Sequence, residues 1–315
     1  MLTNLIFSIN AVAPLFLLLF FGYILKKRDF ISGGFVSSGN KFVFYIGLPA
    51  ALFRSVYSAE LGELLDWRFA AFAVGASLGA FFIIWLIAAL FIKERPIVGA
   101  FTQGAFRGNF AFLGMPLLIS IAGEAGEARA ALILAFIIPV YNIFSIWLLA
   151  VCSGSAQKVG FKTVAFVIVK NPFIIAIALA FVAQLAGIRL PFLLNQSVGY
   201  VANMATPLAL ICLGAGMYFQ GFDAKFKYAL TASLIKVVAL PILFVTVGYM
   251  MGFRGYDIAA LLVLGGIPSA IASYTMVVQM GGDSYVAATI IVLSTFMSAF
   301  TFTLFIYVLR TLGML

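Results

Sequence analysis

The chain has 315 residues, of which 64% are hydrophobic and 9% are charged, and its mean hydropathy is +1.18. Soluble domains carry about 25% charged residues, so this composition excludes a soluble fold and indicates a protein whose solvent is the bilayer. The net charge of +9 indicates basic loops beside anionic lipid rather than a nucleic-acid partner, and the lack of histidine excludes a histidine-based catalytic triad and most zinc sites.

Apolar segments that alternate with short polar connections predict about ten membrane-spanning helices, because roughly 20 helical residues cross a hydrocarbon core of about 30 Å. The first apolar run is followed, not preceded, by Lys26, Lys27 and Arg28, which is the reverse of a secretory signal, so we expect a retained helix. The expected helix cores begin near Ile9, Phe42, Phe69, Ile97, Ala130, Pro172, Ser197, Tyr228, Ile258 and Tyr285.

Lysine and arginine predict the orientation of these helices, because cytoplasmic loops are enriched in them. The connections after odd-numbered helices contain eleven such residues, and the even-numbered connections with the C-terminus contain six. We therefore expect a multi-pass protein of the inner membrane with both termini outside, on the periplasmic side. The eleven are Lys26, Lys27, Arg28, Lys41, Lys93, Arg95, Lys158, Lys162, Lys170, Lys225 and Lys227, and the six are Arg54, Arg68, Arg129, Arg189, Arg254 and Arg310.

The polar connection SGSAQKVG divides the chain almost in half. Residues 1–152 are the expected first five-helix repeat, residues 153–162 a cytoplasmic linker, and residues 163–315 the second repeat. Because five is an odd number, the second repeat would enter the membrane from the opposite side. The sequence therefore predicts an inverted repeat.

Matching proline positions support this repeat. LPAALF, at Leu48–Phe53, resembles TPLALI, at Thr206–Ile211, in the second segment of each half, and predicts helix breaks at Pro49 and Pro207. LGMP and GGIP, which end at Pro116 and Pro268, lie in the fourth segment of each half. Paired glycine and proline interruptions in matching segments are typical of a transport site.

The interruptions in the fourth and ninth segments are expected at the same depth. Arg107 follows Pro96 by eleven residues, or roughly 16 Å of helix, which is near the bilayer midplane. Gly266 follows Asp257 by nine residues, or roughly 14 Å, from the opposite face. We therefore expect the two broken helices to cross.

Proline removes a backbone donor and glycine tolerates the unwound backbone, and the freed groups survive only inside protein or beside a water-filled cavity. The amino-terminal ends of half-helices then attract an anion. The candidate substrate-binding residues are Arg107, Asn109, Gly114, Pro116, Gly266, Pro268, Ser269, Ser273 and Lys236.

Three of these residues have alternative interpretations. Arg107 costs about 2.5–3.5 kcal/mol at the centre of a membrane helix, and its guanidinium suits a substrate carboxylate, a distant carboxylate of the protein or freed carbonyls. Asn109 could contact the ligand, cap the broken helix or do both. Lys236 either extends to the cytoplasmic surface, lines the cavity or balances a buried acid.

The sequence predicts no metal site and no cofactor. Asp283 has the position of a helix cap, and its alternative as a proton-coupling acid is weak because proton relays use acids within the spans. A coupling ion, either a proton or sodium, stays open. Oxygens that could hold sodium belong to Ser269, Ser273, Thr206 and Asn203.

Several segments together resemble the auxin efflux carrier family, which includes plant auxin exporters and bacterial malonate-type permeases. The carrying segments are NKFVFYIGLPAALF (Asn40–Phe53), RGNFAFLGMPLL (Arg107–Leu118), KNP (Lys170–Pro172), TPLALICLGAGM (Thr206–Met217) and GGIPSAIAS (Gly265–Ser273). RGNFAFLGMP is the most specific of them. The short central connection resembles that of bacterial members.

The resemblance implies ten helices in two inverted repeats, an arrangement similar to bile-acid symporters and sodium–proton antiporters. Residues 1–62 and 163–220 would form a scaffold, often dimeric, and residues 67–152 and 226–312 a transport domain. Asn109, Gly114, Pro116 and Pro268 match the crossover of the family. Substrates implied by the resemblance are organic anions such as dicarboxylates or indole acetate.

The expected function is therefore secondary transport of a small organic anion, such as malonate or an auxin-like acid, by alternating access or an elevator motion. The expected partners are this anion, the lipid bilayer and a second copy of the chain. The alternative is a membrane sensor that binds the same ligand without moving it. We expect no enzyme activity, because no cluster of intramembrane histidine, aspartate or cysteine is present in the sequence.

Overall fold

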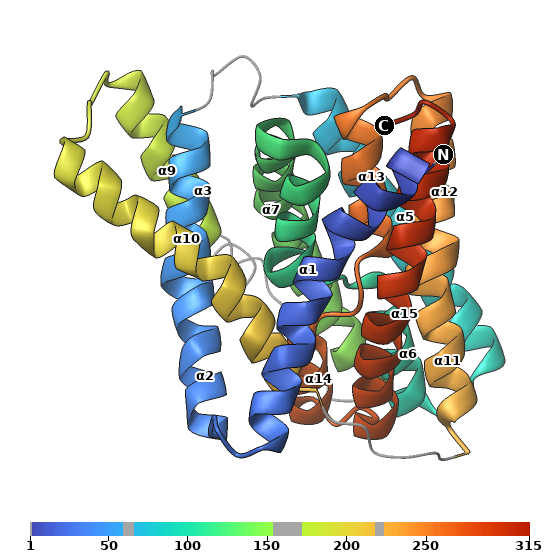
Figure 1. Ribbon diagram of the computed structural model, residues 1–315. Helices are drawn as coiled ribbons and strands as arrows, with labels where there is room; N and C mark the ends of the chain where they lie inside the picture. The colour runs from blue at the N-terminus through green and yellow to red at the C-terminus, as the bar shows by residue number, and fades with distance from the viewer. Residues whose placement is uncertain (1, 59–65, 154–171, 218–223) are drawn as a thin grey trace.

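The computed structural model describes residues 2–58, 66–153, 172–217 and 224–315, and these ranges contain helices and no β-strand (Figure 1). Six helical stretches within them are long and apolar enough to cross a membrane. They are Leu2–Lys27, Trp67–Phe91, Phe110–Cys152, Phe192–Ala215, Phe226–Met250 and Ser284–Thr311. The prediction of an all-helical, multi-pass membrane protein is confirmed, whereas residues 154–162 of the expected linker lie outside the described ranges.

The elements of the first half follow one another with short connections. They are α1 (Leu2–Lys27), α2 (Gly33–Phe42), the π-helical turn η1 (Val43–Gly47), α3 (Leu48–Ser58), α5 (Trp67–Phe91), α6 (Arg95–Phe106), the π-helical turn η2 (Phe110–Gly114) and α7 (Met115–Ser153). Gly123 interrupts α7 with φ 59° and ψ −139°, a conformation that residues with a side chain rarely adopt. The sequence places the connection between its fourth and fifth segments here.

The second half has the same kinds of element. They are α9 (Pro172–Leu185), α10 (Phe192–Ala215), α11 (Phe226–Leu234), the π-helical turn η3 (Ile235–Ala239), α12 (Leu240–Met250), α13 (Tyr256–Gly266), α14 (Ile271–Gln279) and α15 (Ser284–Thr311). The two ends of the chain lie at the same end of the molecule in Figure 1, and the side chain of Asn4 donates to Thr311 Oγ1 at 3.4 Å.

The predicted helix breaks at Pro49 and Pro207 are wrong. Helix α10 continues through Pro207, and Pro49 lies in the first turn of α3, directly after η1. A proline inside a membrane helix loses one hydrogen bond, and a local change of helical register accommodates it without ending the helix. Each of the three described π-helical turns is followed two residues after its end by a proline, namely Pro49, Pro116 or Pro241.

Helix α1 packs closely against α10. A Cβ atom added at Gly22 would overlap the carbonyl group of Ile211, and one added at Gly214 would overlap that of Leu19. Glycines at such contacts let two helix backbones touch. Helix α1 also packs against α15, so it lies between α10 and the right-hand group of helices in Figure 1.

We predict that Gly214→Val lowers the stability of the protein by about 1–3 kcal/mol, because an added side chain must push α1 away from α10. Thermal unfolding of the detergent-solubilised protein measures the loss. Gly79→Val on α5 is the matched control, since a Cβ atom there meets no other atom within 4 Å. Equal melting of the two variants would contradict the close contact.

Arg129 of α7 joins α5 and α13 at one end of the bundle. Its guanidinium forms ion pairs with Asp66 at 2.9 Å and with Asp257 at 2.7 Å, between the rings of Phe69 and Tyr256. Burial opposes ionisation of Asp66, but the Phe69 amide and the Arg129 charge outweigh it and lower the pKa of this carboxyl group. This cluster fixes the first turn of α13, which leads to the second of the predicted interruptions.

Candidate functional site

Two helices end in the interior of the molecule and resume after a few extended residues. Helix α6 ends at Phe106, and η2 begins at Phe110, so residues 107–109 form the first break. Helix α13 ends at Gly266, and α14 begins at Ile271, so residues 267–270 form the second break. The prediction that both segments are interrupted is confirmed, and GGIP lies at the second break. The first break lies before the predicted LGMP, whose residues 113–116 are helical.

The two breaks pair with each other as a short antiparallel bridge, with Gly108 opposite Ser269. The amide of Asn109 donates to the Pro268 carbonyl at 2.7 Å, and the amide of Ala270 donates to the Arg107 carbonyl at 3.2 Å. Unwound backbone cannot face lipid, and here each break supplies hydrogen-bond partners for the other. The expected crossing of the two broken helices is thus seen directly.

Gly108 is the point of closest approach. A Cβ atom at this position would overlap the side chain of Ile267 and would lie 3.3 Å from Lys236 Nζ. The sequence analysis did not single out Gly108. The signal was a glycine between two polar residues inside an apolar segment.

Lys236, on η3, holds the carbonyl end of α13. Its side chain is fully buried, and Nζ donates to the carbonyls of Leu264 at 3.2 Å and Gly265 at 2.9 Å. A cation there complements the negative end of the helix dipole. The interpretation that Lys236 extends to the cytoplasmic surface is therefore wrong, because both of its hydrogen bonds point into the crossing. Neither bond goes to a buried acid.

We predict that Lys236→Met loosens the end of α13, because two buried carbonyls lose a charged donor and each unsatisfied group costs about 1–3 kcal/mol. Amide hydrogen exchange in the last turn of α13 should become roughly tenfold faster or more. Lys227→Met, an exposed lysine on α11, should leave that exchange unchanged. Equal exchange in Lys236→Met and the wild type would show that this lysine does not hold α13.

Arg107 has neutral partners. Its side chain is 8% exposed and donates to Asn142 Oδ1 at 2.8 Å, Ser145 Oγ at 3.3 Å and Met276 Sδ at 2.8 Å. The alternatives of pairing with a distant carboxylate or with freed carbonyls are contradicted by these contacts. Within the described ranges, the positive charge of Arg107 is oriented by α7 and α14 but is not neutralised by a carboxylate.

Asn109 directly precedes η2, and its backbone carbonyl, not its side chain, accepts hydrogen bonds from the first turn. Its carbonyl accepts from the amides of Leu113 at 3.1 Å and Gly114 at 3.3 Å, while its side chain makes no capping hydrogen bond. The cap interpretation of the Asn109 side chain is therefore wrong. Its amide group is left for another partner, such as a ligand.

Buried hydroxyl and amide oxygens gather near the breaks. The Ser269 amide donates to Ser294 Oγ at 3.1 Å, but Ser269 Oγ, Ser273 Oγ and Gln103 Oε1 are buried without a hydrogen-bond partner in the described part of the chain. Gln103 Nε2 lies 3.6 Å from Met276 Sδ, the same sulfur that Arg107 contacts. Unsatisfied buried groups are costly, so they indicate space for a polar ligand or water.

The remaining candidate residues shape the backbone. Gly114 lies in η2, where a Cβ atom would be 2.8 Å from the ring of Phe110, and Pro116 is buried in the first turn of α7. Gly266 is buried at the end of α13, and Pro268 provides the carbonyl that accepts from Asn109. These residues determine the path of the backbone at the breaks, because none of their side chains carries a hydrogen-bonding group.

Two residues that were considered for a coupling ion, Asn203 and Asp283, do not lie at the breaks. Asn203 is exposed on α10, and Asp283 caps α15 through the Val286 amide at 2.9 Å and pairs with Lys225 at 2.7 Å. The cap interpretation of Asp283 is confirmed. The described residues contain no group of three histidine, cysteine, aspartate or glutamate residues that could hold a metal ion.

Sequence reasoning missed Asn142 and Ser145, which accept hydrogen bonds from the Arg107 side chain, and Gln103, which contacts the same Met276 sulfur as Arg107. The available signal was polarity within apolar helices: Asn142 and Ser145 follow Pro139 in α7, and Gln103 lies one turn before Arg107. Polar residues inside membrane segments mark functional sites. That Asn142 and Ser145 contact Arg107 depends on how α7 packs against α6. The spacing of residues within one segment cannot predict such a contact.

Taken together, a multi-pass helical protein with two broken helices paired in its interior, beside two buried cations, has the features of a membrane transporter. The family described as "Membrane transport protein" matches residues 7–163 and again residues 158–306. The chain belongs to this family, and the resemblance to auxin efflux carriers is confirmed.

Curated relatives match almost the whole chain. A protein of Rhizobium meliloti named "Putative malonate transporter" is 26% identical over 310 residues, which are 95% of this chain and 95% of that protein. An "Uncharacterized transporter" of Methanothermobacter thermautotrophicus is 24% identical over 96% of this chain and 98% of its own length. The "Uncharacterized transporter YfdV" of Escherichia coli K12 is also 24% identical, with the same two coverages.

Proposed function

We propose that this protein is a secondary transporter that carries a small organic anion across the membrane and binds its carboxylate at the paired breaks. The observation that carries the proposal is the buried positive charge of Arg107 and Lys236 at the breaks, where the described residues place no carboxylate against either side chain. Buried charges are normally compensated, and a substrate carboxylate would supply the missing negative charge.

The surrounding groups fit an anion better than a cation. The helices η2 and α14 begin at the two breaks, so their first backbone amides and the positive ends of their dipoles lie there. Asn109 adds a side-chain amide, and Ser269 and Ser273 add hydroxyls without partners in the described chain. Arg107 is fixed by Asn142 and Ser145, which reduces the entropy that it must lose on binding.

Malonate is the first substrate to test, because one relative of similar length carries malonate in its name. A dicarboxylate of this size has two negative charges for the two buried cations. In this proposal one carboxylate meets Arg107 and Asn109, and the second is attracted by the electrostatic field of Lys236, which itself stays bonded to α13.

The proposed mechanism is alternating access by an elevator or rocking motion. Residues 67–152 and 226–312 would move with the breaks, and residues 1–62 and 163–220 would form the scaffold and the contact of a homodimer. The proposed architecture is ten helices in two inverted repeats, in the inner membrane with both termini periplasmic. The shared location of the termini supports an even number of crossings.

Flux measurements test the function. The purified protein is reconstituted into liposomes, and uptake of radiolabelled malonate, succinate and indole acetate is followed with imposed proton or sodium gradients. Saturable uptake above that of protein-free liposomes supports transport, and its dependence on one gradient identifies the coupling ion. Ligand-dependent thermal stabilisation without flux under any gradient would overturn transport in favour of a sensor.

A further inference from the structure

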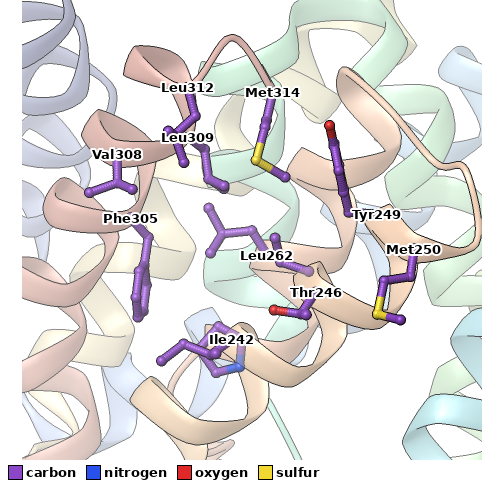
Figure 2. Close-up of a pocket in the computed structure, with 12 residues that line it drawn as sticks. Ile242, Thr246, Tyr249, Met250, Leu262, Phe305, Val308, Leu309, Leu312 and Met314 are labelled. Carbon is purple, nitrogen blue, oxygen red and sulfur yellow. The ribbon is translucent and has the colours of Figure 1, made fainter.

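A groove of about 520 Å³ lies between α12, α13 and α15, away from the breaks (Figure 2). Leu262 of α13, which is 1% exposed, forms its back wall, with Phe305 and Leu309 of α15 on one side and Thr246 and Tyr249 of α12 on the other. None of the candidate substrate-binding residues lines it. The groove is therefore a separate feature of the surface.

The groove opens toward lipid. Its rim residues Ile242, Met250 and Leu312 are 50%, 80% and 66% exposed, and all three are apolar. On a membrane-spanning bundle, such an exposed apolar rim faces the hydrocarbon of the bilayer. An acyl chain can therefore enter the groove from the side.

One end of the groove carries a fixed cation. The guanidinium of Arg254 lies 3.7 Å from the centroid of the Tyr249 ring, and Nη1 donates to the carbonyls of Tyr249 at 2.7 Å and Phe253 at 2.6 Å. The next amide, of Gly255, donates to the carbonyl of Met314, which lines the groove. Arg254 is exposed, and its Nε and Nη2 atoms have no partner within the described residues.

We propose that this groove binds one acyl chain of an anionic glycerophospholipid, with the lipid phosphate on Arg254. Charge complementarity supports this occupant, because the groove is apolar along its length and basic at one end, as an anionic phospholipid requires. Tyr249 supports the same placement, since tyrosine with an apolar body and a polar tip is enriched at the membrane interface. None of the residues that line the groove is acidic, so the groove of a second copy of the chain would offer Arg254 no carboxylate.

Native mass spectrometry of the full-length protein tests the proposal with phosphatidylglycerol and phosphatidylcholine as probes. The wild type should retain one phosphatidylglycerol about tenfold more strongly than phosphatidylcholine, the difference expected for one charged hydrogen-bonded contact. Arg254→Gln should abolish this preference, and Arg189→Gln, an exposed arginine outside the groove, should keep it. The measurement does not depend on transport, so it is independent of the proposed function.

A second pair of variants tests the position of the acyl chain. Thr246→Trp fills the groove and should remove the retained lipid, whereas Val247→Trp, on the next residue of the same exposed helix surface, should leave it bound. Unchanged retention of phosphatidylglycerol in both Arg254→Gln and Thr246→Trp would overturn the proposal. A lipid-free dimer with hydrogen-exchange protection over α12 and α15 would also overturn it, in favour of a second copy as the occupant.

Discussion

Arg107→Gln is expected to lower the apparent affinity for the transported anion by roughly ten- to 150-fold, the range that corresponds to one charged hydrogen bond of about 1.5–3 kcal/mol. Glutamine removes the positive charge and is too short to keep the contacts of Arg107 with both Asn142 and Ser145. The affinity is measured from the concentration dependence of malonate uptake in liposomes, and folding is checked by thermal unfolding.

Two further variants separate charge from geometry at this position. Arg107→Lys keeps the charge but loses the planar guanidinium that contacts three neighbours, so we expect an affinity between those of the wild type and Arg107→Gln. Arg189→Gln, which removes an exposed arginine, should not change the affinity. Equal affinity in Arg107→Gln and the wild type would remove Arg107 from the binding site.

Gly108→Ala is expected to destabilise the protein by about 1–3 kcal/mol and to reduce transport, because the new methyl group overlaps Ile267 and forces the two breaks apart. The hydrogen bonds between Asn109 and Pro268 and between Ala270 and Arg107 would then lengthen. Thermal unfolding and malonate uptake measure the two effects.

A double-mutant cycle shows whether this loss comes from the contact between the breaks. Ile267→Ala makes room for the methyl group at position 108, so Gly108→Ala combined with Ile267→Ala should lose less stability than the sum of the two single changes. Gly114→Ala is the control for glycine replacement near the break, because a Cβ atom there meets Phe110 and not Ile267. Its loss of stability should therefore add to that of Ile267→Ala. Strict additivity for positions 108 and 267 would contradict their contact.

Breaks in the fourth and ninth segments could be predicted because glycine and proline occur together in the middle of both, although the first break, at residues 107–109, precedes the glycine–proline pair of its segment. Glycine and proline alone were misleading: Pro49 follows Gly47 at the same spacing as Pro116 follows Gly114, yet a π-helical turn accommodates Pro49. Helix α10 likewise continues through Pro207. The helix keeps its remaining hydrogen bonds, which have no substitute in lipid. A break needs a second segment that supplies replacement partners, as residues 267–270 do for residues 107–109.

The environment of the two buried cations could not be predicted from sequence. Both were recognised as unusual, but Arg107 is bound by Asn142 and Ser145 from another helix, and Lys236 by carbonyls of α13. These partners are 28 to 38 residues away along the chain, beyond the reach of helical periodicity. The residue types showed that two positive charges lie within the membrane segments. Their hydrogen-bond partners could not be predicted, because these depend on how the helices pack in three dimensions.

Protection of a single cysteine tests most directly whether the paired breaks bind the anion. In a background with Cys152→Ala and Cys212→Ala, Ser273→Cys is alkylated with and without malonate, and Ser197→Cys on the exposed surface of α10 is the control. The account predicts that malonate at ten times its Kd slows alkylation at position 273 about tenfold and does not affect position 197. Equal alkylation rates at position 273, in a protein that still transports malonate, would contradict it.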